Sequence, residues 1–153
     1  MNKTQTYALL LRQLESLLSI ETDPVANMAN TAAVLFNGLP ELNWAGFYVL
    51  RGDVLVLGPF QGKPACVRIP LGRGVCGTTA RTGQTQRVED VHTFQGHIAC
   101  DSASQSEIVI PILKDGQVWG VLDIDSPVLT RFTAEDQKNL EASVRLFEKY
   151  TAL

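Results

Sequence analysis

Three cysteines are the residues of this sequence best suited to covalent chemistry. They are Cys66, Cys76 and Cys100, separated by 9 and 23 residues, so none forms the Cys-x-x-Cys pair typical of metal sites and thioredoxin-like motifs. An odd number of widely spaced cysteines argues against a secreted disulfide framework and favours a reducing compartment, where unusual thiols tend to be catalytic or metal-binding. We therefore expect a cytoplasmic protein with a working thiol.

Cys100 is the strongest candidate for a reactive thiol, because it lies in a long polar segment, residues 89–105, that shows no periodicity. A loop of that length inside one domain is uncommon unless it serves function, and core packing gives no reason to place a thiol there. His97 could stabilise its thiolate, or could be an inert histidine bonded to the backbone. There are two alternatives. The cysteines could be inert core thiols, or all three could bind zinc together with His97, although they lack the short spacing usual in zinc sites.

Carboxylates form the second group with chemical potential. Asp123 and Asp125 are two residues apart in a predicted strand, so both leave the sheet on the same side. The hairpin partner of that strand contains Glu107, and its register depends on the turn. A two-residue turn ending at Gly116 places Glu107 opposite Ile124, whereas a three-residue turn ending at the same glycine places it opposite Asp123. We predict the three-residue turn.

Three acids on one patch repel one another, which raises their proton affinity or requires a bound cation. This arrangement suits a ligand with an ammonium group together with one protonated carboxyl. A solvated acidic face is the alternative. The solvated face is disfavoured because the neighbouring strand positions are strongly apolar, as expected for central strands covered on both faces. These positions are Ile108, Ile110, Leu122 and Ile124.

The length and composition fit a single domain that spans residues 1–153. The chain has 45% hydrophobic residues and a net charge of -3, which gives no electrostatic reason to bind nucleic acid or anionic lipid. The apolar run Ala8–Leu11 is too short to span a bilayer, so no membrane association is expected.

Periodicity and caps predict the elements that must position these groups. An apolar stripe at helical spacing covers residues 7–18, Asp23 and Pro24 begin a second helix, and Thr133 with Asp136 begins the last one. Between them lie alternating aromatic and β-branched runs joined by tight turns. We predict an α+β fold, an antiparallel sheet with helices gathered on one face. The expected strands are residues 44–50, 54–57, 65–69, 87–88, 106–113 and 118–125, with a short helix ending near residue 83.

Six motifs resemble those of one known family, the free methionine-(R)-sulfoxide reductases, which have a GAF domain. The likeness covers nearly the whole chain, and the three cysteines fall where that family has them. The motifs are Asn43–Tyr48, Gly58–Lys63, Gly72–Gly77, Gly96–Asp101, Ser106–Ile108 and Gly120–Ser126.

The resemblance implies a six-stranded antiparallel GAF sheet with the N- and C-terminal helices on one face, in a homodimer. It implies no nucleotide or tetrapyrrole cofactor and no metal, but an enclosed substrate, free methionine sulfoxide, and thioredoxin as the external reductant. It assigns the attack to Cys100, with a competing claim for Cys76, and a disulfide between Cys66 and Cys100. Trp44 and Tyr48 would form an apolar wall, although both could be plain core aromatics.

These residues meet the needs of the reaction. The sulfoxide oxygen leaves poorly unless an acid or N–H groups stabilise it, and Glu107, Asp123 or Asp125 could supply the proton. The acid cluster would hold the ammonium of a free amino acid, which a peptide-bound methionine lacks. A GAF module that senses a small amine without turnover is the alternative function.

Overall fold

The computed structural model describes residues 1–98 and 100–153, so Ala99 of the Gly96–Asp101 motif lies outside the described residues. The helices are α1 (Lys3–Leu18), α2 (Pro24–Gly38), α3 (Gly74–Thr82) and α4 (Ala134–Tyr150), with a 3-10 turn at Val91–Thr93. The strands are β1 (Trp44–Arg51), β2 (Val54–Gly62), β3 (Arg68–Pro70), β4 (Gln86–Val88), β5 (Ser106–Lys114) and β6 (Gln117–Ser126).

The six strands form one antiparallel sheet, as predicted, and their order in it is β3-β2-β1-β6-β5-β4. Two strands differ clearly from the prediction. β2 continues to Gly62 rather than ending at Leu57, and the pairing of β3 with β2 begins at Arg68 rather than at Ala65. The predicted caps are present: the Asp23 side chain accepts from Ala26 N–H, and Thr133 and Asp136 form a capping box. These short-range hydrogen bonds depend on neighbouring residues, so the sequence reveals them.

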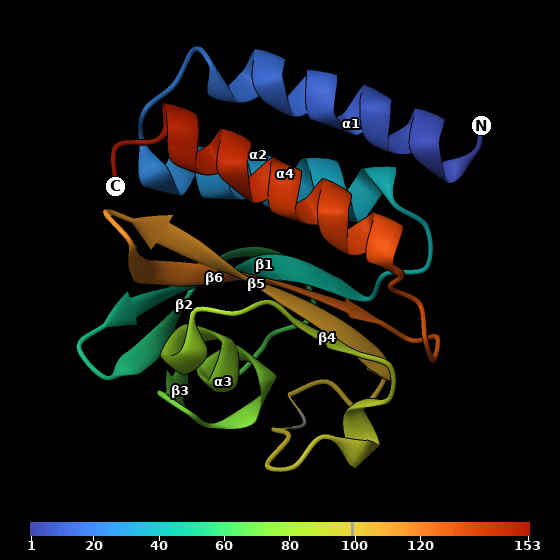
Figure 1. The fold of residues 1–153 in the computed structure, drawn as a ribbon, viewed down its shortest axis with the longest axis vertical. Helices are drawn as coiled ribbons and strands as arrows, with labels where there is room; N and C mark the ends of the chain where they lie inside the picture. Colours follow the sequence, from blue (N-terminus) through green and yellow to red (C-terminus); the bar gives the residue numbers. More distant parts are fainter. Residues whose placement is uncertain (99) are drawn as a thin grey trace.

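The molecule is layered, with helices on both faces of the sheet (Figure 1). α2 and α4 cover one face, and α1 packs on these two helices rather than on the strands. The terminal helices therefore lie on one side, as expected. α3 packs on the opposite face against β3, β5 and β6, so the expectation that all helices gather on one face is wrong for α3. In the part of the chain that is described, no helix has the length and apolar character needed to cross a membrane.

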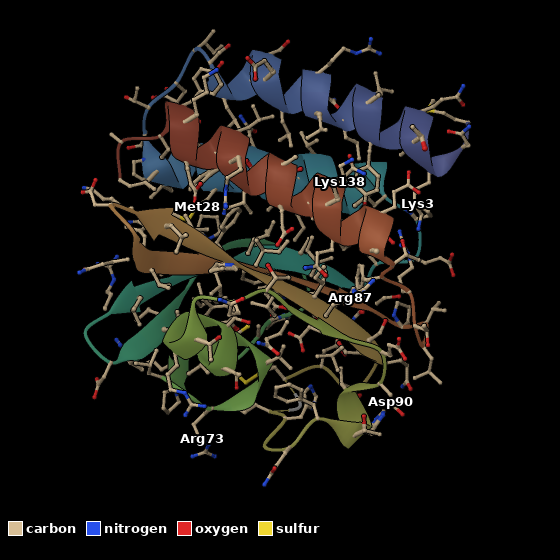
Figure 2. All side chains as sticks on the ribbon, viewed as in Figure 1. Lys3, Met28, Arg73, Arg87, Asp90 and Lys138 are labelled. Carbon is tan, nitrogen blue, oxygen red and sulfur yellow. A yellow bond between two sulfur atoms is a disulfide. The ribbon has the colours of Figure 1, made fainter. Side chains whose placement is uncertain are left out.

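Each face of the sheet has its own hydrophobic core. Met28 of α2 lies in the layer between helices and sheet (Figure 2), in a core that also contains Ile108, Leu122 and Phe147. The core under α3 contains Val109 and Val121, among others. Because side chains alternate along a strand, β5 and β6 send aliphatic residues to the first core and a mixture of valines and acids to the second.

The β5–β6 turn is a two-residue turn, so the predicted three-residue turn is wrong. Lys114 pairs with Gln117, and the two turn residues Asp115 and Gly116 have φ values of 52° and 78°. Left-handed backbone at both central positions is the geometry that matches the twist of a two-residue hairpin, and an Asp-Gly pair favours it.

A β-bulge next to this turn changes the register of the hairpin. Leu113 pairs with Val118, but Ile112 pairs with Gly120, so Trp119 is the extra residue on β6. A bulge leaves one ladder group without its normal partner, and here the N–H of Leu113 donates to Glu148 Oε2 of α4 at 2.6 Å.

The bulge decides where Glu107 points. The two-residue turn alone would pair Glu107 with Ile124 and send its carboxylate into the helix-covered core. The extra residue shifts the pairing by one, and Glu107 lies opposite Asp125. The predicted partner, Asp123, is therefore wrong, but the acid still shares a face with both aspartates because directly opposed residues point to the same side.

Candidate active site

Three central strands bring the acids and an aromatic residue together on the face under α3. Asp125 of β6 lies between Glu107 of β5 and Trp44 of β1. Glu107 and Asp123 are each only 6% exposed. Burial, followed by the charges of Asp123 and Asp125, raises the pKa of Glu107 well above its usual value. Burial and Asp123 likewise raise the pKa of Asp125, so this group of acids favours protons or a cationic ligand.

Aromatic rings form the wall beside these acids. Trp44 stacks with Tyr48 at 6.0 Å and with Phe60 at 5.1 Å between ring centroids. The Trp44 Nε1–H donates to the carbonyl oxygen of Lys63 at 3.0 Å, and the Tyr48 hydroxyl donates to the carbonyl oxygen of Cys66 at 2.8 Å. Burial raises the pKa of Tyr48, with Asp123 adding to the effect, so the phenol stays neutral and keeps its donor. The two aromatics thus fix the segment that contains Cys66.

The cysteines divide into a pair and a single thiol. Cys66 and Cys100 form a disulfide with Cα atoms 5.6 Å apart, the pairing that the family resemblance implied. Cys76 is free and buried in α3, where burial, followed by the charge of Asp123, raises the pKa of its thiol well above the usual value. The disulfide occupies two of the sulfurs that a zinc site with Cys76 and His97 would need.

His97 lies beside the acids. Its Nε2 is 3.9 Å from Glu107 Oε1. Burial lowers the pKa of His97, with the nearby His92 adding to the effect, so the ring is neutral at pH 7. A neutral imidazole at this distance contributes a polar wall to the site and gives little electrostatic stabilisation to a thiolate.

The cavity under α3 has a volume of about 40 Å³ and joins these groups in one place. Every predicted site residue except Cys66 is among the residues that line it, within the described part of the chain. Its lining comprises Trp44, Tyr48, Pro64, Ala65, Ile69, Arg73, Gly74, Val75, Cys76, His97, Ile98, Cys100, Asp101, Ser104, Glu107, Asp123 and Asp125.

The N-terminus of α3 is the main feature of this cavity that the sequence prediction missed. Arg73 occupies the N-cap position without a side-chain hydrogen bond, and its side chain is directed away from the sheet (Figure 2). Gly74, Val75 and Cys76 of the first turn line the cavity. The first N–H groups of a helix have no acceptor within the helix, so they can receive an anionic group. The sequence does give one indication of these free N–H groups, because no Ser, Thr, Asp or Asn stands at the N-cap position of this helix.

Asn43 ties the loop of Cys100 to the sheet, and it too was missed. Its side-chain amide donates to Asp101 Oδ2 and to Ser104 Oγ, both at 3.0 Å. Together with the disulfide at Cys100, these bonds fix the residues that follow Cys100 against the start of β1.

Comparisons with known proteins agree with this architecture. The family model of the GAF domain matches residues 13–149. The free methionine-R-sulfoxide reductase of Escherichia coli is 58% identical over 152 residues, which cover 99% of this chain and 92% of that protein. The structure of fRMsr of Staphylococcus aureus in complex with substrate has a TM-score of 0.91 and 51% identity, covering 95% of both chains.

A further solved structure is the free methionine-R-sulfoxide reductase of Neisseria meningitidis in complex with its substrate. It has a TM-score of 0.95 and 47% identity, and it covers 98% of this chain and 90% of that chain. The sheet, the cavity beneath α3 and the cysteine pair define a GAF-domain oxidoreductase. Within that class, the chain belongs to the free methionine-R-sulfoxide reductase family.

Proposed function

We propose that this protein reduces free L-methionine (R)-S-oxide to L-methionine, with Cys100 as the nucleophile and Cys66 as the second thiol. The observation that supports this most directly is a single cavity lined by Cys100 and by Glu107, Asp123 and Asp125, with Cys100 joined to Cys66 in a disulfide. A sulfur nucleophile, a proton source and a redox partner are the minimum set for sulfoxide reduction by thiols.

The proposed cycle consumes two thiols and releases water. The thiolate of Cys100 attacks the sulfoxide as its oxygen is protonated, the oxygen passes to the enzyme sulfur, and methionine leaves a sulfenic acid behind. The thiol of Cys66 then attacks this sulfur, the S–S bond forms and the hydroxyl departs as water. The disulfide form described above is thus the state that follows product release, and reduction of the S–S bond would free Cys100 and enlarge the cavity for the next substrate.

Burial and exposure favour Cys100 over Cys76 as the nucleophile. A thiol attacks as its thiolate, and burial raises the pKa of Cys76, with the charge of Asp123 acting in the same direction. Cys76 also has no disulfide partner among the described residues, whereas Cys100 has Cys66. Cys66 is not among the described residues that line the cavity, and this supports its role as the resolving thiol rather than the attacking one.

Recognition of a free amino acid follows from the charges around the cavity. We assign the ammonium to Asp123 and Asp125, the carboxylate to the N–H groups at the start of α3, and the methyl end to the wall of Trp44 and Tyr48. Glu107, whose pKa is raised by burial and then by the two aspartates, is the acid for the sulfoxide oxygen. A peptide-bound methionine sulfoxide has neither free charge, so it would be excluded.

The proposed cycle requires an external dithiol and no other cofactor. Thioredoxin is the expected reductant, and it would approach the disulfide beside Cys66, which is half-buried and is followed by the exposed Val67. A reducing cytoplasm would supply such a dithiol. We further propose that the chain acts as one GAF domain over residues 1–153 and as a homodimer.

Thiol counting by mass spectrometry after a single turnover tests this function. Reduced, desalted protein is mixed with free methionine (R)-S-oxide, and methionine release and remaining thiols are measured. Wild type is expected to lose two thiols and to release about one methionine per chain. Cys66→Ser is expected to release methionine and to keep a sulfenic acid that a dimedone-type reagent traps. Asp53→Asn changes an exposed residue outside the cavity, so it should match wild type in both methionine release and thiol loss.

Two results would overturn parts of the proposal. If Cys100→Ser still releases a full equivalent of methionine, Cys76 is the nucleophile and the assigned roles are wrong. If wild type binds the amino acid but releases no methionine, the chain is a sensing module and not an enzyme.

A further inference from the structure

Cys76 is a buried thiol that the proposed reaction does not use, and it faces two of the acids. Its Sγ, one carboxylate oxygen of Glu107 and one of Asp123 all lie within 4.8 Å of one another. Cys76 is 5% exposed, so all three side chains are shielded from bulk water. One thiolate and two carboxylates form a mixed donor set that suits a thiophilic divalent cation such as Zn²⁺ or Cd²⁺.

Asp123 provides a second, independent indication of a cationic ligand. Its side chain lines the cavity and is almost completely buried, yet no hydrogen-bond donor among the described residues reaches its Oδ1. An unpaired carboxylate oxygen in such an environment is costly, and a positive charge that enters the cavity would satisfy it. The ammonium of a substrate can do so, but the thiol of Cys76 is only a weak hydrogen-bond acceptor for it. A divalent cation can bind both groups at once.

The geometry leaves room for an ion. Cys76 comes from α3, Glu107 from β5 and Asp123 from β6, so the three donors converge from two sides of the cavity. The donor atoms, at most 4.8 Å apart, would have to move closer together to give bond lengths of about 2.3 Å to sulfur and about 2.0 Å to oxygen. The cavity volume of about 40 Å³ holds a single ion even in the disulfide form.

We propose that Cys76, Glu107 and Asp123 form a reversible binding site for one Zn²⁺ or Cd²⁺ ion per chain, at the floor of the cavity that receives the amino acid. On binding, the thiol of Cys76 and any protonated carboxyl lose their protons to solvent, and the metal–sulfur and metal–oxygen bonds form. The cysteine disulfide takes no part, so the oxidised protein binds the ion as well. Because the ion fills the position of the ammonium, bound metal and free methionine sulfoxide exclude each other.

Titration of the oxidised protein with CdCl₂ tests the site, because Cys76 is then the free thiol and a cadmium–thiolate bond gives a charge-transfer band in the ultraviolet. We expect one Cd²⁺ per chain and the thiolate band. Cys76→Ser should abolish the band, and Asp123→Asn should keep it while raising the Kd at least about tenfold. Asp53→Asn, which removes an exposed acid away from the cavity, should leave the Kd unchanged.

No band in the oxidised wild type, or an unchanged Kd in Asp123→Asn, would overturn the proposal. Asp123→Asn leaves the thiol of Cys76 intact, so its Kd tests the proposed site even if Cys76→Ser does not fold.

A competition experiment separates this site from the proposed function. The variant Cys66→Ser/Cys100→Ser has Cys76 as its single thiol, and free methionine sulfoxide added to its cadmium form should remove the band. Simultaneous binding of metal and amino acid would refute the shared cavity floor. If the metal-free variant fails to bind the amino acid while cadmium still binds, the proposed substrate is wrong and the metal site stands.

Discussion

Replacing Asp136 by asparagine tests the buried ion-pair network that joins α1 to α4. Asp136 Oδ2 lies 2.8 Å from Lys3 Nζ and 3.3 Å from Arg131 Nη1, and its Oδ1 accepts from the Tyr7 hydroxyl at 2.7 Å. The N–H of Thr133 also donates to Oδ2 at 2.8 Å. Lys3 lies at the start of α1, beside the start of α4 (Figure 2). One carboxylate thus joins both ends of the chain.

The pKa of Asp136 gives the size of the effect. Burial by itself raises this pKa, but hydrogen bonds from Lys3, the N–H of Thr133 and Tyr7 outweigh burial and lower it from 3.8 to about 2. At about 1.36 kcal/mol per pH unit, the ionised carboxylate contributes about 2 kcal/mol to folding. Because the folded pKa is depressed, this contribution is complete above about pH 5 and is lost as the pH falls towards 2. About 1 kcal/mol is lost by pH 3.

We expect Asp136→Asn to lower the free energy of unfolding at pH 7 by about 3 to 5 kcal/mol, because it leaves a buried cation without its partner. The side chain of Arg131 is only 8% exposed, so solvent cannot replace the lost carboxylate. This loss is a large part of the total free energy of unfolding, which is about 5 to 15 kcal/mol for a typical domain. The variant should also lose less stability than wild type between pH 7 and pH 3.

Urea unfolding followed by the fluorescence of Trp44 and Trp119 measures both quantities. Asp53→Asn, an exposed change of the same chemistry, should stay within about 0.5 kcal/mol of wild type at both pH values. If Asp136→Asn costs less than about 1 kcal/mol and keeps the pH dependence of wild type, the network does not stabilise the fold as argued.

Three further substitutions test the sheet and the wall of the cavity. In Gly120→Ala the new Cβ would clash with the carbonyl oxygen of Tyr48 on the neighbouring strand, so we expect the free energy of unfolding to fall by about 1 to 3 kcal/mol. Thermal unfolding measures this loss, and an unchanged Tm would contradict it. Glu148→Ala removes the acceptor for the Leu113 N–H at the bulge, and urea unfolding should report a loss of about 1 to 3 kcal/mol. Trp44→Ala removes the proposed methyl wall, so the KM for free methionine sulfoxide should rise about 10- to 100-fold in steady-state assays, and an unaltered KM would remove Trp44 from the site.

The elements themselves could be predicted because their causes are local. A capping box, a proline at the first helical position and an alternating strand pattern each depend on residues a few positions apart. This is why the positions of α2, α4 and the strands β1, β5 and β6 match the prediction, although the turn that joins β5 to β6 does not. The chemical groups could also be identified, since Cys100 in a polar loop and the Asp123 and Asp125 pair are unusual in a sequence without functional demands.

The register of the acids could not be predicted, because it depends on contacts between distant segments. The turn at Gly116 fixes the hairpin locally, but the bulge at Trp119 leaves the N–H of Leu113 to be satisfied by Glu148 of α4. A shift of one residue moves a side chain to the other face of the sheet. The face on which Glu107 lies was therefore settled by packing rather than by the turn.

Local patterns along the chain are enough to predict a thiol in a polar loop, acids on one strand and the helices and strands that hold them. Packing of distant segments brings Cys66, 34 residues away along the chain, to Cys100, and places the uncapped start of α3 in the same cavity as the acids. The two kinds of feature differ in range, because caps, turns and strand alternation act over a few residues. Disulfide pairing and a shared cavity depend instead on how the sheet and α3 pack.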